Sequence, residues 1–266
     1  MPFVENQGAK IYWDQHWNQQ GQGDPVLLIM GLGYPSQMWY RTRPGLAETY
    51  RTIAVDNRGV GRSDMPPGPY GIALMASDAL AALDAAGVDR AHVYGISMGG
   101  MIAQEFALQY PDRVRSLILG CTAAGGPNAV RAEPEATEML MARGKMTPQE
   151  AAEAAVPFIY HRDTPRARID EDMAVRRDWL ARPEAYVNQL TGILKWEAYS
   201  RLDQVRAPTL VIHGDSDRLV APGNAQLIAG RIPGAKLVII PNASHIYTTD
   251  QPEASQQAVL NFLNLR

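Results

Sequence analysis

The sequence predicts an α/β fold in which a mostly parallel central sheet is flanked by helices and carries an all-helical insertion. Up to about residue 124, and again near the C-terminus, short apolar runs alternate with segments of helical spacing. This rhythm is typical of parallel βαβ units. Between about residues 125 and 200, only helix-like segments follow one another. We therefore expect an α/β core of residues 1–124 and 201–266 and a helical cap of residues 125–200.

The expected strands of the core are short and mostly apolar. Residues 10–13 alternate in polarity as an edge strand does, and a polar, glycine-containing turn follows at residues 18–24. Continuous apolar runs are expected of strands that are buried on both faces. The further expected strands are residues 26–30, 52–55, 91–94, 114–119, 209–212 and 237–240.

Helices are expected between these strands and throughout the insertion. In the core they cover residues 38–49, 71–86, 100–108, 223–229 and 253–263. In the insertion, helical spacing covers residues 134–142, 148–156, 170–179 and 184–194. An all-helical insertion between two parallel strands is expected to cover the C-terminal edge of the sheet.

The composition excludes several kinds of partner. The net charge of −3 over 266 residues gives no reason to expect nucleic acid or an anionic membrane. The single cysteine, Cys121, excludes an internal disulfide framework and a cysteine-rich metal site. The first residues lack the basic and apolar regions of a signal peptide, and no apolar stretch is long enough to cross a bilayer. We expect a cytoplasmic protein with no metal and no membrane partner.

Residues 95–99 read Gly-Ile-Ser-Met-Gly, a G-x-S-x-G sequence between an expected strand and an expected helix. In such a turn the serine is held in a strained conformation that exposes its hydroxyl above the sheet edge. The flanking glycines are required because a Cβ at either position would clash with the neighbouring strand or helix. Ser97 is therefore the candidate nucleophile. The alternative is a glycine-rich turn with a helix-capping serine.

A nucleophilic serine needs a general base, and the sequence offers five histidines. His245 is the best placed, because it follows the expected strand 237–240 and so shares the C-terminal sheet edge with Ser97. His213 ends a strand and could pair with a backbone carbonyl instead. The other three lie in the N-terminal region, near a strand start and in the insertion: His16, His92 and His161.

The base in turn needs an orienting acid. Asp215 and Asp217 both follow the expected strand 209–212 and reach the same sheet edge. Asp215 is closer to the strand end and could fix the turn through its own backbone amides. Asp217 is better placed to extend toward the loop that carries His245. We favour Asp217, which gives the chain order Ser97, Asp217, His245.

This order is the one that the α/β-hydrolase fold uses, and the sequence resembles the α/β-hydrolase superfamily over essentially its full length, in particular its serine carboxylesterase and enol-lactonase-like branch. Five ordered motifs carry the resemblance: the oxyanion loop at 31–33, the D-x-R-G-x-G-x-S turn at 56–63, the G-x-S-x-G elbow at 95–99, the H-G-x-x-D acid loop at 213–217, and Gln251-Pro252-Glu253 after the histidine. Relatives commonly carry His-Gly in the oxyanion loop, whereas this chain has Met30-Gly31. That histidine helps to hold the loop, so its replacement leaves the loop's support in question.

The resemblance implies roles for several further residues. The backbone N–H groups of Leu32 and Met98 would form the oxyanion hole, which does not depend on their side chains. Asp56 and Arg58 would brace the loops behind the active site. A phosphate-binding role for this turn is a weaker alternative, because no P-loop lysine follows.

By analogy with the family, the substrate pocket is apolar. Its expected lining includes Leu32 and Met98, together with Phe158, Trp196 and Ile246. The alternative for the residues of the insertion is that they simply pack its core. Charges between residues 121 and 200 are mixed, with 12 acidic and 10 basic residues, so they do not indicate a strongly ionic substrate.

The expected reaction is hydrolysis of a small carboxylic ester through an acyl-enzyme intermediate, without a cofactor. The nucleophile, base and orienting acid would be Ser97, His245 and Asp217. A lactonase resembling 3-oxoadipate enol-lactonase is a close alternative, and carbon–carbon bond hydrolases and perhydrolases use the same three residue types. A catalytically silent ligand-binding protein on the same scaffold is the alternative of a different class.

Overall fold

The computed structural model describes residues 2–17, 23–179 and 181–265. Its centre is an eight-stranded sheet with the order β1-β2-β4-β3-β5-β6-β7-β8. The strands are β1 (Phe3–Asn6), β2 (Ala9–His16), β3 (Pro25–Ile29), β4 (Arg51–Val55), β5 (Ala91–Ile96), β6 (Val114–Gly120), β7 (Thr209–Gly214) and β8 (Lys236–Ile240). All neighbours from β4 to β8 are parallel, and only the pairs β1–β2 and β2–β4 are antiparallel. The predicted α/β class with a mostly parallel sheet is confirmed.

Helices cover both faces of this sheet. Apolar side chains of α2 (Ile72–Ala85), α3 (Met98–Gln109) and α8 (Gly223–Arg231) pack on one face, and those of α1 (Arg43–Ala47) and α10 (Pro252–Leu263) pack on the other. Strand β3 shows why its apolar run is continuous. Leu27 and Ile29 join the first of these clusters, whereas Val26 and Leu28 join the second. Each residue of the strand therefore needs an apolar side chain.

Two details near the N-terminus differ from the sequence prediction. Residues 10–13 lie in β2, which pairs with β4 on one side and β1 on the other, so the edge strand is β1. The helix expected over residues 38–49 is divided into a 3-10 helix, Ser36–Arg41, and α1, which begins at Arg43 with Pro44 in its first turn. A proline at this point cannot donate to a continuing helix, so a new helix begins. Of the turn expected at residues 18–24, residues 18–22 lie outside the described part of the chain.

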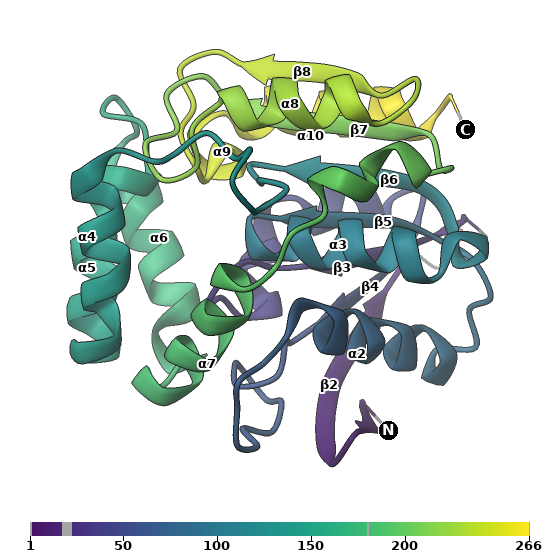
Figure 1. Ribbon diagram of the computed structural model, residues 1–266, viewed down its shortest axis with the longest axis horizontal. Helices are drawn as coiled ribbons and strands as arrows, with labels where there is room; N and C mark the ends of the chain where they lie inside the picture. Colours follow the sequence, from purple (N-terminus) through teal and green to yellow (C-terminus); the bar gives the residue numbers. More distant parts are fainter. Residues whose placement is uncertain (1, 18–22, 180, 266) are drawn as a thin grey trace.

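The segment between β6 and β7 contains four α-helices: α4 (Pro134–Ala142), α5 (Pro148–Ile159), α6 (Arg166–Arg176) and α7 (Pro183–Leu194). Proline occupies the first turn of α4, α5 and α7, where its missing N–H would have no helical partner. Since β6 and β7 are neighbours in the sheet, the chain leaves and re-enters the sheet at adjacent positions. Figure 1 shows these helices grouped at the end of the sheet toward which the β8 arrow points. They therefore stand beside the C-terminal sheet edge.

Candidate active site

Ser97 occupies a sharp turn between β5 and α3, with φ 57° and ψ −122°. A non-glycine residue held in such a region costs on the order of 1–3 kcal/mol, and such strain clusters at functional sites. A Cβ on Gly95 would lie 2.0 Å from the Gly99 carbonyl oxygen, and a Cβ on Gly99 would lie 2.1 Å from the carbonyl oxygen of Ile29 in β3. Both glycines are therefore sterically required. This confirms the reason that the sequence predicted for them.

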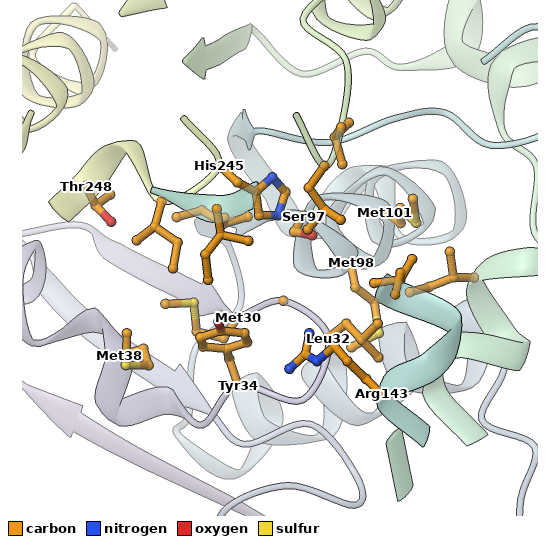
Figure 2. Close-up of a pocket in the computed structure, with 18 residues that line it drawn as sticks. Met30, Leu32, Tyr34, Met38, Ser97, Met98, Met101, Arg143, His245 and Thr248 are labelled. Carbon is orange, nitrogen blue, oxygen red and sulfur yellow. The ribbon is translucent and has the colours of Figure 1, made fainter. Parts of the chain in front are cut away.

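Loops after β7 and β8 bring an aspartate and a histidine to the same sheet edge. The Nδ1 atom of His245 lies 2.8 Å from Oδ2 of Asp217, and both side chains are buried. His245 and Ser97 line one pocket, and Figure 2 shows the imidazole ring directly beside the serine hydroxyl. Asp217 thus contacts one side of the His245 imidazole, and the Ser97 hydroxyl lies beside that ring, although the three residues are separated in the sequence.

The carboxylate of Asp217 is surrounded by donors. Its Oδ1 atom accepts hydrogen bonds of 2.9 Å from the backbone N–H groups of Leu219 and Val220. Its Oδ2 atom contacts His245 and, at 3.1 Å, Nε2 of His213. Burial raises the pKa of Asp217, but the charges and hydrogen bonds of the two histidines outweigh it, so the pKa lies well below its ordinary value. Asp217 is therefore ionised at neutral pH.

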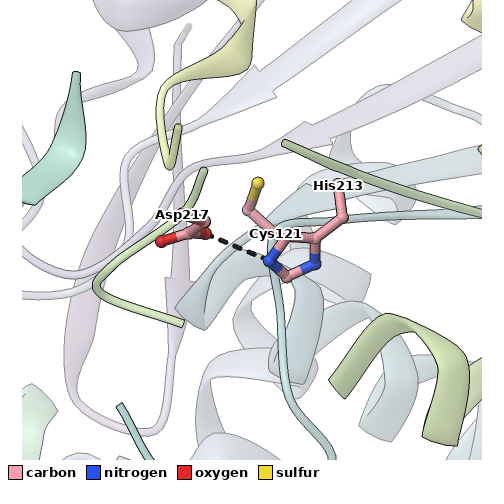
Figure 3. Close-up of side chains that lie close together, drawn as sticks. All are labelled: Cys121, His213 and Asp217. Carbon is pink, nitrogen blue, oxygen red and sulfur yellow. Dashed lines mark hydrogen bonds and ion pairs between the residues drawn. The ribbon is translucent and has the colours of Figure 1, made fainter. Parts of the chain in front are cut away.

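His213 belongs to a buried cluster with Cys121 and Asp217 (Figure 3). Its Nε2 atom also lies 2.8 Å from the carbonyl oxygen of Val220, so this nitrogen carries a hydrogen that two acceptors share. The carbonyl partner was predicted from the sequence, and the contact with Asp217 was not. Burial and the charge of Asp217 raise the pKa of the Cys121 thiol well above its ordinary value. The thiol is therefore protonated at neutral pH, and the contact of His213 with Asp217 supports the carboxylate in addition to the contact with His245.

Asp215, the competing carboxylate, points elsewhere. It accepts hydrogen bonds from the backbone N–H groups of Asn242 at 3.2 Å and Ala243 at 3.4 Å. These residues begin the loop that carries His245. Asp215 therefore holds the loop after β8. The sequence interpretation that it fixes its own turn through its own backbone amides is wrong about these partners, which belong to a distant loop.

The loop after β3 lies against Ser97. A Cβ on Gly31 would lie 3.0 Å from the Cβ of Ser97. Met98 is the first residue of α3, and the first N–H groups of a helix have no partner within the helix. Over the described part of the chain, neither the Leu32 nor the Met98 N–H donates a hydrogen bond to another residue. Both amides are thus available to an oxygen atom bound beside Ser97.

Two amide side chains hold this loop in place of the histidine that Met30 replaces. Asn57 donates a hydrogen bond of 2.9 Å to the carbonyl oxygen of Met30. Gln189, on α7, accepts one of 2.9 Å from the N–H of Gly33. Gln189 could not be identified from the sequence, because no local motif marks a glutamine of one helix as the partner of a distant loop.

The turn at residues 56–63 is braced from two sides. Asp56 accepts hydrogen bonds from the backbone N–H groups of Ser36 at 2.6 Å and Arg62 at 2.9 Å. Arg58 forms a buried, bidentate ion pair with Asp78, with both distances 2.7 Å. The predicted bracing by Asp56 and Arg58 is confirmed, and Asp78 is a partner that the sequence did not predict.

The pocket at Ser97 is mainly apolar, and three of the five predicted lining residues line it: Leu32, Met98 and Ile246. Phe158 and Trp196 do not, so that prediction is wrong for them. Trp196 is buried in the main core, where its Nε1 donates a hydrogen bond of 2.8 Å to Glu105. The Phe158 ring lies under the guanidinium of Arg218, 4.9 Å from it. Phe158 packs against the apolar cluster of the insertion, which was the alternative for these residues. Trp196 packs in the main core instead, which neither interpretation expected.

The sheet order and the strained serine turn beside a buried aspartate–histidine pair are those of an α/β hydrolase. Residues 24–248 match the model of a protein family, described as alpha/beta hydrolase fold. The chain belongs to this family.

Three proteins that are similar to this chain over nearly its full length have names that indicate hydrolytic activity. A protein from Azorhizobium caulinodans, provisionally named carbamate hydrolase RutD, is 32% identical over 270 residues, covering 98% of each chain. The crystal structure of the enol-lactonase from Burkholderia xenovorans LB400 is 25% identical, with a TM-score of 0.89 over 99% of this chain and 100% of that one. A thermophilic esterase from Thermogutta terrifontis is 29% identical, with a TM-score of 0.84 over 99% and 97% of the two chains. The family to which the chain belongs and the three similar proteins therefore support a hydrolytic activity.

Proposed function

We propose that this protein is a serine hydrolase that cleaves a small carboxylic ester through an acyl-enzyme intermediate. The observation that carries the proposal is the 2.8 Å contact between Asp217 and His245, with the other side of the imidazole beside Ser97 in one pocket. A buried carboxylate on Nδ1 holds the imidazole with its Nε2 lone pair free to accept a proton. Among the described residues that line the pocket, no other side chain offers the serine a comparable base.

The reaction follows from these positions. Ser97 Oγ attacks the ester carbonyl while His245 Nε2 accepts its proton, and Asp217 stabilises the imidazolium that forms. The Leu32 and Met98 amides would hold the oxyanion, each contributing about 3 kcal/mol by analogy with measured cases. His245 then protonates the departing alcohol, and a water molecule activated by His245 releases the acid.

We further propose that residues 125–200 act as a cap over this pocket. Four side chains of that segment line it together with residues of the core: Leu140, Arg143, Ile159 and Ile193. A pocket closed in this way suits a small ester better than a polymer.

A lactonase is the second candidate function. A lactone is an intramolecular ester, so the same three residues would open it by the same steps. The overall similarity to the Burkholderia xenovorans enol-lactonase supports this candidate. The relative named as a carbamate hydrolase adds carbamates to the carbonyl compounds worth testing.

The test is a substrate panel of p-nitrophenyl esters of increasing acyl length, small lactones and a p-nitrophenyl carbamate. The Ser97→Ala variant should lose turnover of every substrate while keeping its fold. Ser216→Ala is the matched control. It removes a hydroxyl that donates to Asp215 Oδ1 at 2.7 Å and has no other side-chain hydrogen bond within the described residues. Undiminished hydrolysis by Ser97→Ala would contradict the proposal.

A further inference from the structure

One charged side chain lines the apolar pocket, and the proposed mechanism does not use it. Arg143 lies in a 3-10 helix, Arg143–Lys145, that follows α4, and it is only 8% exposed. Figure 2 shows its guanidinium reaching into the pocket near Leu32 and Tyr34. A buried cation normally has a counter-charge, because taking a charge out of water is costly.

Arg143 has no such partner among the residues that the structure describes. No carboxylate of these residues lies at ion-pair distance from it, and its buried Nε–H has no hydrogen-bond acceptor. The guanidinium instead contacts Tyr186: it lies 4.8 Å from the centre of the ring and also interacts with the hydroxyl. These contacts hold the side chain but supply no counter-charge and no acceptor for the Nε–H.

Other buried arginines of the protein are compensated. Arg58 forms its bidentate pair with Asp78. Arg176 also has an unpartnered Nε–H, but it donates to the Tyr34 hydroxyl and interacts electrostatically with the Asp172 carboxylate. Arg143 differs from both, because no described carboxylate compensates it and its guanidinium lines the cavity in which substrate would bind.

The other residues that line the pocket also favour binding of an anion beside the Arg143 guanidinium. No aspartate or glutamate is found among the described residues that line it, so a bound carboxylate would meet no like charge. The surrounding side chains include Leu32, Leu140 and Ile193. In such apolar surroundings a charge-assisted hydrogen bond is stronger than in water, and the guanidinium fork matches a carboxylate in shape.

We infer that Arg143 forms a carboxylate-binding subsite, and that the preferred substrates carry a carboxylate besides the ester group that is cleaved. This inference rests on the proposed function of the pocket and specifies its substrate class. The carboxylate can belong to the acyl part or to the alcohol part of the ester, and the experiment distinguishes the two.

The test compares charged and neutral esters of similar shape. In the acyl arm, mono-p-nitrophenyl glutarate is compared with p-nitrophenyl pentanoate. In the alcohol arm, 4-carboxyphenyl butyrate is compared with phenyl butyrate. Arg143→Gln should lower kcat/KM for the carboxylate ester of at least one arm by about 10- to 100-fold, while neutral esters remain nearly unchanged. Arg143→Lys, which keeps the charge but not the fork, should retain an intermediate preference.

Arg162→Gln is the matched control, because that arginine side chain is 88% exposed, and it should change neither arm. Equal losses for charged and neutral esters in Arg143→Gln would show a purely structural role and overturn the inference. So would a wild-type enzyme without preference for the carboxylate ester in either arm.

A separate measurement distinguishes failure of the subsite from failure of the proposed function. If the wild-type protein hydrolyses no ester, calorimetric binding of monomethyl glutarate to wild type and to Arg143→Gln still tests the subsite. About tenfold weaker binding by the variant would support it. Equal affinity would overturn it.

Discussion

Gln189 and Gly33 lie 156 residues apart in the sequence, yet the Gln189 side-chain oxygen accepts a hydrogen bond of 2.9 Å from the Gly33 N–H. The amide nitrogen of the same side chain donates at 2.9 Å to the carbonyl oxygen of Arg58. One buried glutamine therefore joins the loop beside Ser97 to the braced turn at residues 56–63. This link explains how the loop is held although Met30 replaces the usual histidine.

Replacement of Gln189 by alanine should weaken both the fold and the reaction. The Gly33 N–H and the Arg58 carbonyl would lose their partners, which costs about 1–3 kcal/mol for each buried group. We expect a lower free energy of unfolding in urea and a lower kcat. Gln149→Ala removes an exposed glutamine of α5 and should change neither quantity. Equal stability and activity of the two variants would contradict this role of Gln189.

The two glycines of the serine turn offer a test by addition of one methyl group. Gly99→Ala places a Cβ 2.1 Å from a backbone oxygen of β3, so the strand or the helix must shift. We expect a loss of several kcal/mol or failure to fold, since overpacking a tight core costs about 1–3 kcal/mol even without a backbone clash.

Gly230→Ala is the matched control for that variant. Gly230 also lies in a helix, α8, but a Cβ there meets nothing within 4 Å. Alanine at this position should raise helix stability by about 0.5–1 kcal/mol. A thermal unfolding scan compares the two variants, and a similar melting temperature for both would contradict the steric argument.

Asp217→Asn should leave the backbone in place but orient His245 wrongly. An amide in place of the carboxylate favours the wrong imidazole tautomer, and the equivalent change in a serine protease lowers kcat by about 10⁴-fold. Asp215→Asn, in the neighbouring turn, should reduce activity far less. If both variants lose the same activity, the choice of Asp217 as orienting acid is wrong.

Asp217 should also make stability depend on pH. Its pKa in the folded protein lies below the value of about 3.9 for an unfolded chain. The ionised carboxylate therefore stabilises the folded protein above about pH 4, and this contribution is lost as the pH falls below that value. Between about pH 4 and pH 2, the unfolding free energy of the wild type should fall more steeply than that of Asp217→Asn. Parallel curves would contradict the lowered pKa.

Much of this architecture could be predicted because its signals are local or follow from strand order. The apolar run of β3 indicates a strand buried on both faces, and the five residues around Ser97 specify the tight turn. Asp217 and His245 follow parallel strands, whose carboxyl ends share one edge, so their proximity follows from topology. Their catalytic roles remain predictions.

The residues that were missed act through tertiary contacts without a local pattern. Gln189, Asp78 and Arg143 each depend on how one helical segment packs on a distant loop or ring. Phe158 and Trp196 were placed in the pocket wrongly because large aromatic side chains of a helical insertion are equally suited to packing. The mixed charge of the insertion likewise gave no sign that one arginine, Arg143, lines the cavity with no carboxylate partner among the described residues.

The central claim is that Ser97 is an activated nucleophile, and covalent labelling with a fluorophosphonate probe tests it most directly. Intact-mass measurement should show one probe group on the wild-type protein, and peptide mapping should place that group on Ser97. Ser97→Ala should remain unlabelled, and His245→Ala should react far more slowly, because a hydroxyl without its base is a weak nucleophile. A wild-type protein that does not react, or that carries the probe on another residue, would contradict the account.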